Sequence, residues 1–187
     1  SEGYATFEDE VMYLDALVIA QAVHNNGGIV MMQVQKMVKK ATLHPKAVRI
    51  PGYLVDIVVI DPDQTQLYGG APVNRFISGD FVLDDSQQTA LPLNQRKLVA
   101  RRALFEMRKG AVGNVGVGIA DGIGLVAREE GCADDFILTV ETGPIGGITS
   151  QGIAFGANVN TRAILDMTSQ FDFYHGGGLD VCYLSFA

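Results

Sequence analysis

The sequence predicts an α/β protein built on open, mainly parallel sheets with flanking helices. Apolar runs of strand length alternate with segments of helical pattern along the chain. The 22 glycines exceed the usual share, and many follow an apolar run directly, as tight strand-to-helix turns require. Hydrophobic residues make up 48% of the 187 residues and charged residues 19%, so a sizeable core can form.

The first third of the chain is expected to contain one helix and two strands. Residues 6–28 have a helical pattern, in which Thr6 can cap the N-terminus, three acidic residues follow, and Asn26 with two glycines marks the end. The apolar runs at 29–38 and 53–61 then predict strands.

Residues 61–93 have a different character from the segments on either side. They carry the successive turn signals DPDQ, YGG, APVN, ISGD and DDSQQ, with little periodicity. Such a stretch is long for a loop inside one compact domain. It is therefore interpreted as a connector between an α/β unit at 1–60 and a second unit at 94–187.

The second unit is expected to open with a helix at 93–110, capped by Asn94 and ended by a left-handed Gly110. Its pattern favours a solvated basic face over a ligand clamp. The basic residues concerned are Arg96, Lys97, Arg101 and Arg102.

A strand at 114–119, a helix at 122–131 and a strand at 136–140 follow. Because the connections are short, the two strands are expected to be parallel with a right-handed crossover. Residues 172–178 are expected to form a turn. The alternating segment after them predicts a last strand, and its end without a turn suggests that the chain is a fragment.

Charge and cysteine content narrow the class of partner and compartment. The net charge is −7 and the pI is near 4.8, with no basic stripe, which argues against nucleic acid or an acidic membrane as a partner. Cys132 and Cys182 have no metal-ligand spacing and the three histidines are scattered, so a metal site is not predicted. Without a visible signal peptide or a run of roughly 20 apolar residues, a soluble cytoplasmic protein is expected.

The stretch GNVGVGIADGIG at 113–124 has a glycine-rich turn between a strand and a helix. Gly116 and Gly118 suit a phosphate-holding turn, but Asp121 occupies the third glycine position of the GxGxxG spacing and would repel a pyrophosphate. Two further interpretations remain open: close packing of helix on strand, or a backbone pocket for a carbonyl or thioester oxygen.

Glu141 ends the apolar run ILTV and precedes a glycine-rich stretch. In open α/β sheets, ligands bind at the carboxyl ends of strands. A carboxylate there can act as a base, a metal ligand or a nucleophile, but a solvated acid at a strand end has the same pattern. The residues alone favour the solvated acid.

Other polar residues near these segments carry weaker signals. Asp121 faces the same end of the sheet and is expected to cap the following helix, whereas Asp134 and Asp135 look solvated. Asp180 is assigned a cross-strand structural role in preference to a site role. For His175, a flexible turn is favoured over a ligand contact.

Several of these segments together resemble the family I CoA-transferases. In order along the chain they are HPKAVRIPGYLVDIVVI (44–60), NVGVGIADGIG (114–124), VETGPIGG (140–147) and HGGGLDVCYL (175–184). The resemblance covers essentially the whole chain. It is strongest to the single-chain bacterial short-chain acyl-CoA:acetate transferases, which are related to succinyl-CoA:3-ketoacid transferase.

The resemblance implies two similar α/β domains, of which this chain holds parts. Residues 1–60 would end the N-terminal domain, 61–93 would connect the domains, and 94–187 would begin the C-terminal domain with the catalytic glutamate. Implied partners are acyl-CoA and small carboxylic acids, and a homo-oligomer is expected. No cofactor beyond the CoA substrate is implied, and no metal.

The family's catalytic glutamate corresponds to Glu141, which would form a glutamyl-CoA thioester in a ping-pong transfer. Thr142 departs from the commoner Asn of the motif, and Ala120 replaces a common Pro. Alternatives are a CoA-ester hydrolase and a non-catalytic module that binds CoA or another ligand. The CoA- or substrate-binding residues implied by the resemblance, including candidate oxyanion donors, are Gly116, Val117, Gly118, Ile119, Ala120, Gly146 and Gly147.

Overall fold

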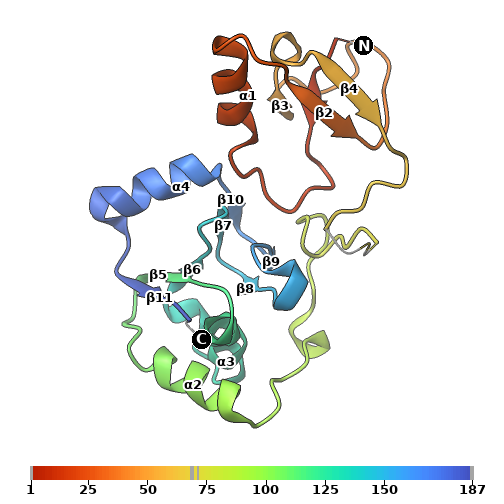
Figure 1. Cartoon of the computed structure of the whole chain (residues 1–187). Helices are drawn as coiled ribbons and strands as arrows, with labels where there is room; N and C mark the ends of the chain where they lie inside the picture. Colours follow the sequence, from red (N-terminus) through yellow and green to blue (C-terminus); the bar gives the residue numbers. More distant parts are fainter. Residues whose placement is uncertain (1, 68–69, 71, 186–187) are drawn as a thin grey trace. The chain divides into compact units, whose positions relative to one another are not determined.

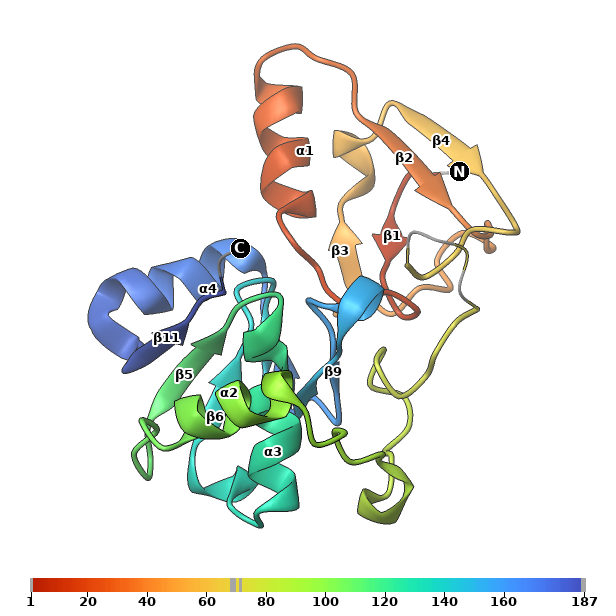
Figure 2. The same ribbon diagram turned by 60° about the horizontal axis from the view of Figure 1, so that its bottom comes forward.

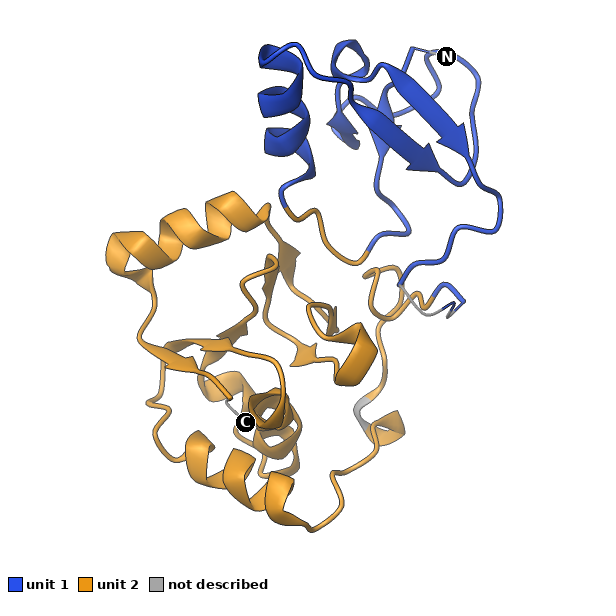
Figure 3. Cartoon of the chain, in the orientation of Figure 1, with its two compact units in different colours: residues 1–10, 15–73 blue, residues 11–14, 74–187 orange. Residues whose placement is uncertain are grey.

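The computed structural model of the chain describes residues 2–67, 70 and 72–185. The chain forms two compact units, residues 1–10 with 15–73 and residues 11–14 with 74–187 (Figure 3). The division into family domains at 60 and 94 stays a prediction.

Unit 1 contains one helix and two small sheets (Figure 1). Its elements are β1 (Ala5–Thr6), α1 (Ala16–Asn25), β2 (Met31–Val34), β3 (Val48–Ile50), the 3-10 turn η1 (Gly52–Leu54) and β4 (Ile57–Ile60). Strand β1 pairs antiparallel with β3, and β2 pairs parallel with β4. The buried apolar side chains of this unit include those of Ala5, Ala20, Ile50 and Leu54.

The predicted helix at 6–28 is correct only in its second half. Thr6 belongs to strand β1 and caps nothing, and Leu14 has a φ of 48°, which an α-helix does not accommodate. The helix therefore begins at Ala16. Its predicted end is confirmed, because Asn26 is the C-cap and Gly27 follows in the left-handed region.

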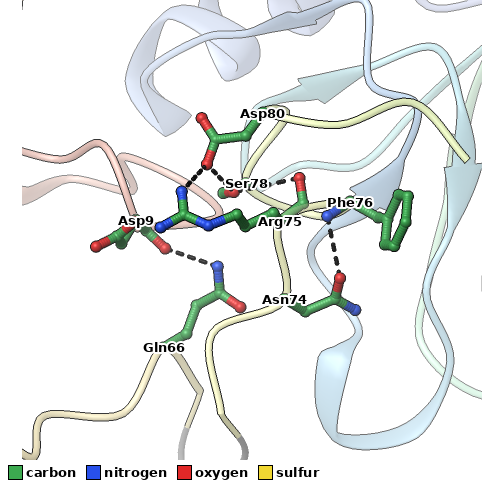
Figure 4. Close-up of polar contacts among 7 residues, drawn as sticks. All are labelled: Asp9, Gln66, Asn74, Arg75, Phe76, Ser78 and Asp80. Atoms are coloured by element: carbon green, nitrogen blue, oxygen red, sulfur yellow. Dashed lines mark hydrogen bonds and ion pairs between the residues drawn. The ribbon is translucent and has the colours of Figure 1, made fainter.

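Of the described residues between 61 and 93, only Asp85–Gln87 form a regular element, the 3-10 turn η2. Hydrogen bonds of polar side chains, to backbone or to other side chains, hold this region (Figure 4). In unit 1, the Gln66 amide donates to the Asp9 carbonyl at 2.7 Å. In unit 2, Asp80 accepts from Arg75 at 2.8 Å and from the Ser78 hydroxyl at 3.1 Å.

Unit 2 is built on a five-stranded sheet (Figures 1 and 2). Its strands are β5 (Val112–Val115), β6 (Ile137–Thr139), β7 (Pro144–Ile145), β10 (Ala163–Ile164) and β11 (Val181–Tyr183), in the spatial order β10-β7-β6-β5-β11. Strands β6, β5 and β11 are parallel, whereas β7 and β10 are antiparallel to their neighbours. The predicted parallel pairing of β5 with β6 is confirmed. A separate antiparallel pair consists of β8 (Ile148–Thr149) and β9 (Asn158–Val159).

The core of unit 2 lies between the sheet and two helices, α2 (Gln95–Leu104) and α3 (Ile123–Glu129). Ile123 and Val126 of α3 are fully buried, because the short crossover from β5 to β6 presses this helix onto the strands. A third helix, α4 (Met167–Phe173), runs along a different part of the unit from α2 and α3 (Figure 1). The other core members are Ala100, Leu104, Val115, Ala120, Ala127, Phe136 and Leu138.

Three predicted elements of unit 2 differ from the structure. The strand expected at 114–119 is β5, which ends at Val115, and a turn and the 3-10 helix η3 (Ile119–Gly122) occupy the rest of that range. Helix α2 starts as expected, with the Asn94 side chain accepting the Lys97 N–H at 3.1 Å, but it ends at Leu104, six residues before Gly110. The segment 172–178 was expected to be a turn, but α4 extends to Phe173 and a π-helical turn over Tyr174–Gly178 follows it, which Gly177 breaks with a left-handed φ of 88°. A Cβ on Gly178 would lie 2.1 Å from the Phe173 ring, so this turn can close only on a glycine.

We expect Ile123→Ala to lower the free energy of unfolding of unit 2 by about 2–5 kcal/mol, because the change empties a fully buried site in the core. Urea unfolding followed by circular dichroism measures this loss. Leu93→Ala is the matched control, since that side chain is 82% exposed, and should stay within about 0.5 kcal/mol. Equal losses in the two variants would contradict this core assignment.

Candidate active site

The parallel pairing of β5 with β6 brings two predicted segments to one edge of the sheet. Asn114 lies opposite Thr139, so Gly116 and Glu141 each come two residues beyond a paired position. The turn at 116–120 and the segment after β6 therefore leave the sheet side by side. The structure thus brings Glu141 close to the glycine-rich turn.

The Glu141 carboxylate has no hydrogen-bond partner among the described residues. The side chain is half-buried, and its Oε2 atom is fully buried without a donor. A buried carboxylate oxygen normally accepts at least one hydrogen bond, because leaving it unpaired costs free energy. Its lone pairs remain available to an incoming group.

The turn after Glu141 is anchored by the next two residues. The Thr142 hydroxyl donates to the Gly156 carbonyl at 2.6 Å. Gly143 has a φ of 121°, and a Cβ added there would lie 2.0 Å from the Leu165 carbonyl oxygen. Only glycine fits this position, so the direction in which the chain leaves Glu141 is set by backbone packing.

The turn after β5 is held from two sides. The Gly116 N–H donates to the Tyr183 carbonyl at 2.8 Å, and the Ala120 N–H donates to the Ser185 hydroxyl at 3.2 Å. The Arg96 guanidinium donates to the Gly118 carbonyl at 2.9 Å. No acceptor in the described chain binds the N–H of Val117 or of Gly118, which leaves two backbone donors at this strand end.

Asp121 is buried beneath this turn and is not the cap of α3 that was expected. Its Oδ1 accepts from Gln151 at 2.7 Å and lies 3.5 Å from Arg96. Arg96 therefore joins the carboxylate to the Gly118 carbonyl and is not merely part of a solvated face. A recess of about 180 Å³ adjoins these side chains, lined by Leu91, Pro92, Asn94, Arg96, Ile119, Gly122 and Gln151.

The predicted glycines Gly146 and Gly147 lie between β7 and β8 and have packing roles. The Gly146 N–H already donates to the Leu138 carbonyl at 2.7 Å, so it is not available to a substrate in this structure. A Cβ on Gly147 would lie 2.3 Å from the Val159 carbonyl oxygen, because β9 passes close to it. The N–H groups of Val117, Gly118 and Gly147 have no acceptor in the described chain.

The other candidate residues have structural partners or lie exposed. The Asp180 carboxylate accepts a hydrogen bond from the Val112 N–H at 2.8 Å, which confirms its cross-strand structural role. Asp134 pairs with Arg162, and Asp135 with Lys109. His175 is exposed in the π-helical turn. On α2, Lys97 pairs with Glu129, Arg101 with Glu130 and Arg102 with Glu106.

Sequence reasoning missed a polar cluster around the Tyr174 hydroxyl. The Tyr174 hydroxyl lies 2.6 Å from the Thr139 hydroxyl, 3.1 Å from Asn114 Oδ1 and 2.8 Å from Gln170 Nε2. Burial raises the pKa of Tyr174, hydrogen bonds from Thr139 and Gln170 oppose this, and the negative charge of Glu141 raises it further. The available signal was polar Asn114 and Thr139 inside otherwise apolar strands.

The described residues contain no cluster of three His, Cys, Asp or Glu side chains that could hold a metal ion. In the same part of the chain, no helix has both the length and the apolar character that a membrane crossing requires.

Residues 1–61 match the family Coenzyme A transferase. The whole chain is 96% identical to part of the acetate CoA-transferase YdiF of Escherichia coli K12, and 99% of it aligns at 40% identity with the caffeate CoA-transferase of Acetobacterium woodii. It spans 35% and 36% of these relatives' lengths.

A solved structure supports the same resemblance. It is an acyl-CoA transferase (YdiF) of Escherichia coli O157:H7, described as a thioester complex with CoA. The TM-score is 0.88 at 90% identity, with 100% of this chain and 36% of that chain covered. The resemblance to CoA-transferases that the sequence predicted is therefore confirmed, as is the α/β fold.

We expect Gly143→Ala to destabilise unit 2 by at least about 2 kcal/mol, because the new Cβ would meet the Leu165 carbonyl at 2.0 Å in a left-handed backbone. Urea unfolding of the variant measures the loss. Gly176→Ala is the matched control, since nothing lies within 4 Å of a Cβ there. A Gly143→Ala protein as stable as this control would show that the turn is wrongly placed.

We expect Thr142→Val to cost about 1 kcal/mol, because it removes the hydroxyl donor to Gly156 while keeping the volume. Thermal unfolding gives the loss. Thr168→Val on α4 repeats the chemical change at an exposed position and serves as control. A Thr142→Val loss no greater than the control's would argue against this anchor.

Proposed function

Because this chain resembles coenzyme A transferases over its whole length, we propose that it forms part of an enzyme that transfers CoA between a short-chain acyl-CoA and a free carboxylate such as acetate. The proposal takes its substrate class from the acetate and caffeate CoA-transferases that the chain is similar to. Since the chain spans about a third of those relatives, the complete activity is proposed for a protein that supplies the remaining parts.

One observation carries the chemical part of the proposal. After the neighbouring strands β6 and β5, Glu141 has a buried carboxylate oxygen that no described donor reaches, and the N–H groups of Val117 and Gly118 have no acceptor in the described chain. A nucleophile needs free lone pairs, and the carbonyl that it attacks needs donors for the developing oxyanion. The pairing of β5 with β6 supports the proposal, because it brings the segments that carry these groups to one edge of the sheet.

The proposed reaction proceeds in balanced steps through Glu141. Its carboxylate oxygen attacks the thioester carbonyl carbon, the carbon–sulfur bond breaks, and CoA leaves as the thiolate. The thiolate then attacks the glutamyl carbonyl carbon of the resulting anhydride, which releases the first carboxylic acid as its anion. The enzyme is left as a glutamyl-CoA thioester, and a second carboxylate reverses the two steps.

Each carbonyl addition places negative charge on an oxygen near the glycine-rich turn. The N–H groups of Val117 and Gly118 are the proposed donors to this charge, each contributing roughly 3 kcal/mol to the transition state. The bonds from Arg96, Tyr183 and Ser185 keep the turn in place, so the donors need not reorganise during the reaction.

Further features of the complete protein are part of the same proposal. No step calls for a cofactor beyond CoA or for a metal. A homo-oligomer is proposed from the resemblance alone. A cytoplasmic location fits the two cysteines, which are free thiols in the structure.

We expect Glu141→Ala in the complete protein to abolish the CoA adduct and to lower the transfer rate by at least about 10³-fold, because the nucleophile is lost. Incubation with acetyl-CoA and mass spectrometry of the peptide that contains Glu141 measure the adduct. Glu106→Ala, at an exposed glutamate of unit 2, is the matched control and should form the adduct normally.

Product analysis with and without acetate separates transfer from hydrolysis. A transferase needs the acceptor acid for net turnover, whereas a hydrolase releases CoA without it. Full transfer activity in the Glu141→Ala protein would refute the proposed nucleophile, and binding of CoA without turnover by the wild type would favour a non-catalytic module.

A further inference from the structure

We propose that Tyr174 is a positioning residue for Glu141, because its hydroxyl ties together the ends of the two strands that carry Glu141 and the glycine-rich turn. This inference rests on the proposed role of Glu141 as the nucleophile. It concerns a side chain that belongs to α4 and its π-helical extension, outside the strand-end motifs discussed above.

The cluster connects three elements through one hydroxyl group. Thr139 comes from β6, two residues before Glu141, and Asn114 comes from β5, two residues before Gly116. The Tyr174 hydroxyl is within hydrogen-bond distance of both side chains, at 2.6 Å and 3.1 Å. Gln170, one helical turn earlier, donates to the same hydroxyl at 2.8 Å.

The cluster lies on the face of the sheet opposite the core of unit 2. Leu138 and Val115 point into the core formed with α2 and α3. Thr139 and Asn114 therefore point to the opposite face, and Glu141 follows Thr139 by two residues, in the turn after β6. The effect of the Glu141 charge on the pKa of Tyr174 agrees with this placement.

The Tyr174 hydroxyl both accepts and donates hydrogen bonds in this cluster, and a phenylalanine ring can do neither. The hydroxyl accepts from Gln170 and has a single proton, which it can give to Asn114 Oδ1 or to Thr139 Oγ1. Thr139 can in turn donate to the Gly113 carbonyl at 3.1 Å or to Tyr174. Phenylalanine would fill the space but would leave the buried amides of Asn114 and Gln170 without this partner.

The consequence for the reaction is geometric. In the proposed attack, the Glu141 oxygen and the N–H donors of the glycine-rich turn must reach the same carbonyl group. The positions of Glu141 and of the turn both depend on where β6 and β5 end. A misplacement of about 1 Å can cost on the order of 100-fold in rate. Tyr174 binds both strand ends and so fixes the distance between Glu141 and the donors of the turn. It acts without contact with the acyl group itself.

Single-turnover formation of the CoA adduct in the complete protein tests the inference. We expect Tyr174→Phe to slow adduct formation about 10- to 100-fold, with the KM for acetyl-CoA changed by less than about threefold. Tyr53→Phe is the matched control, because it makes the same chemical change at a side chain that is 69% exposed in unit 1 and belongs to neither strand end. Its adduct should form within about twofold of the wild-type rate.

Two further measurements keep the inference falsifiable if Tyr174→Phe does not fold. Thr139→Val removes another member of the cluster and should also slow the adduct. The phenol of a fluorinated tyrosine placed at position 174, which can be followed without the Tyr174→Phe protein, should titrate at lower pH in Glu141→Ala. The reason is that the negative charge of Glu141 raises the pKa of Tyr174, and the alanine removes it.

The outcomes separate this inference from the proposed function. Wild type without any adduct overturns the role of Glu141, and with it the positioning role. A normal wild-type adduct, together with Tyr174→Phe and Thr139→Val proteins that react at the wild-type rate, overturns the role of Tyr174 alone. A Tyr174 titration unmoved by Glu141→Ala also counts against the inference.

Discussion

The parallel pairing of β5 with β6 is the constraint on which the rest of unit 2 depends. Because Asn114 is paired with Thr139, the segments that follow these two residues leave the sheet at the same edge. Parallel neighbours need a crossover, and α3 provides it by burying Ile123 and Val126 against the strands. The apolar core therefore stabilises the fold and also sets the separation of the two segments proposed to react with a thioester.

The acids of unit 2 illustrate how the fold distinguishes one carboxylate from others. Asp121 is as buried as a core residue, but Gln151 and Arg96 bind it. Asp180 receives a strand N–H, and Asp134 pairs with an arginine on the surface. Glu141 has a buried oxygen that none of the described donors reaches. An unpaired charge is costly, and the tightly packed backbone around Gly143 keeps it in place at that cost.

Much of this edge of the sheet could be predicted from the sequence. A strand, a short helix and a second strand with brief connections imply parallel pairing. Asn94 predicts the start of α2, because its side chain is suited to cap a helix N-terminus. Two-residue strands such as β7 and β10 have no periodicity to detect. The cluster around Tyr174 could not be predicted from the sequence either, because Asn114 and Tyr174 are 60 residues apart and come into contact only in the folded sheet. The sequence around Gly146 also could not show that its N–H is already bonded, because the acceptor is the Leu138 carbonyl of another strand.

Thr142, which departs from the commoner Asn of the resembling motif, has a specific place in this structure. Its hydroxyl reaches the Gly156 carbonyl at 2.6 Å, and its methyl lies 3.4 Å from where a Gly156 Cβ would be. A short side chain can make that bond because residue 156 is a glycine with a φ of 101°, which lets the two backbones approach. Thr142 thus anchors the turn that carries Glu141 to the segment at Gly156.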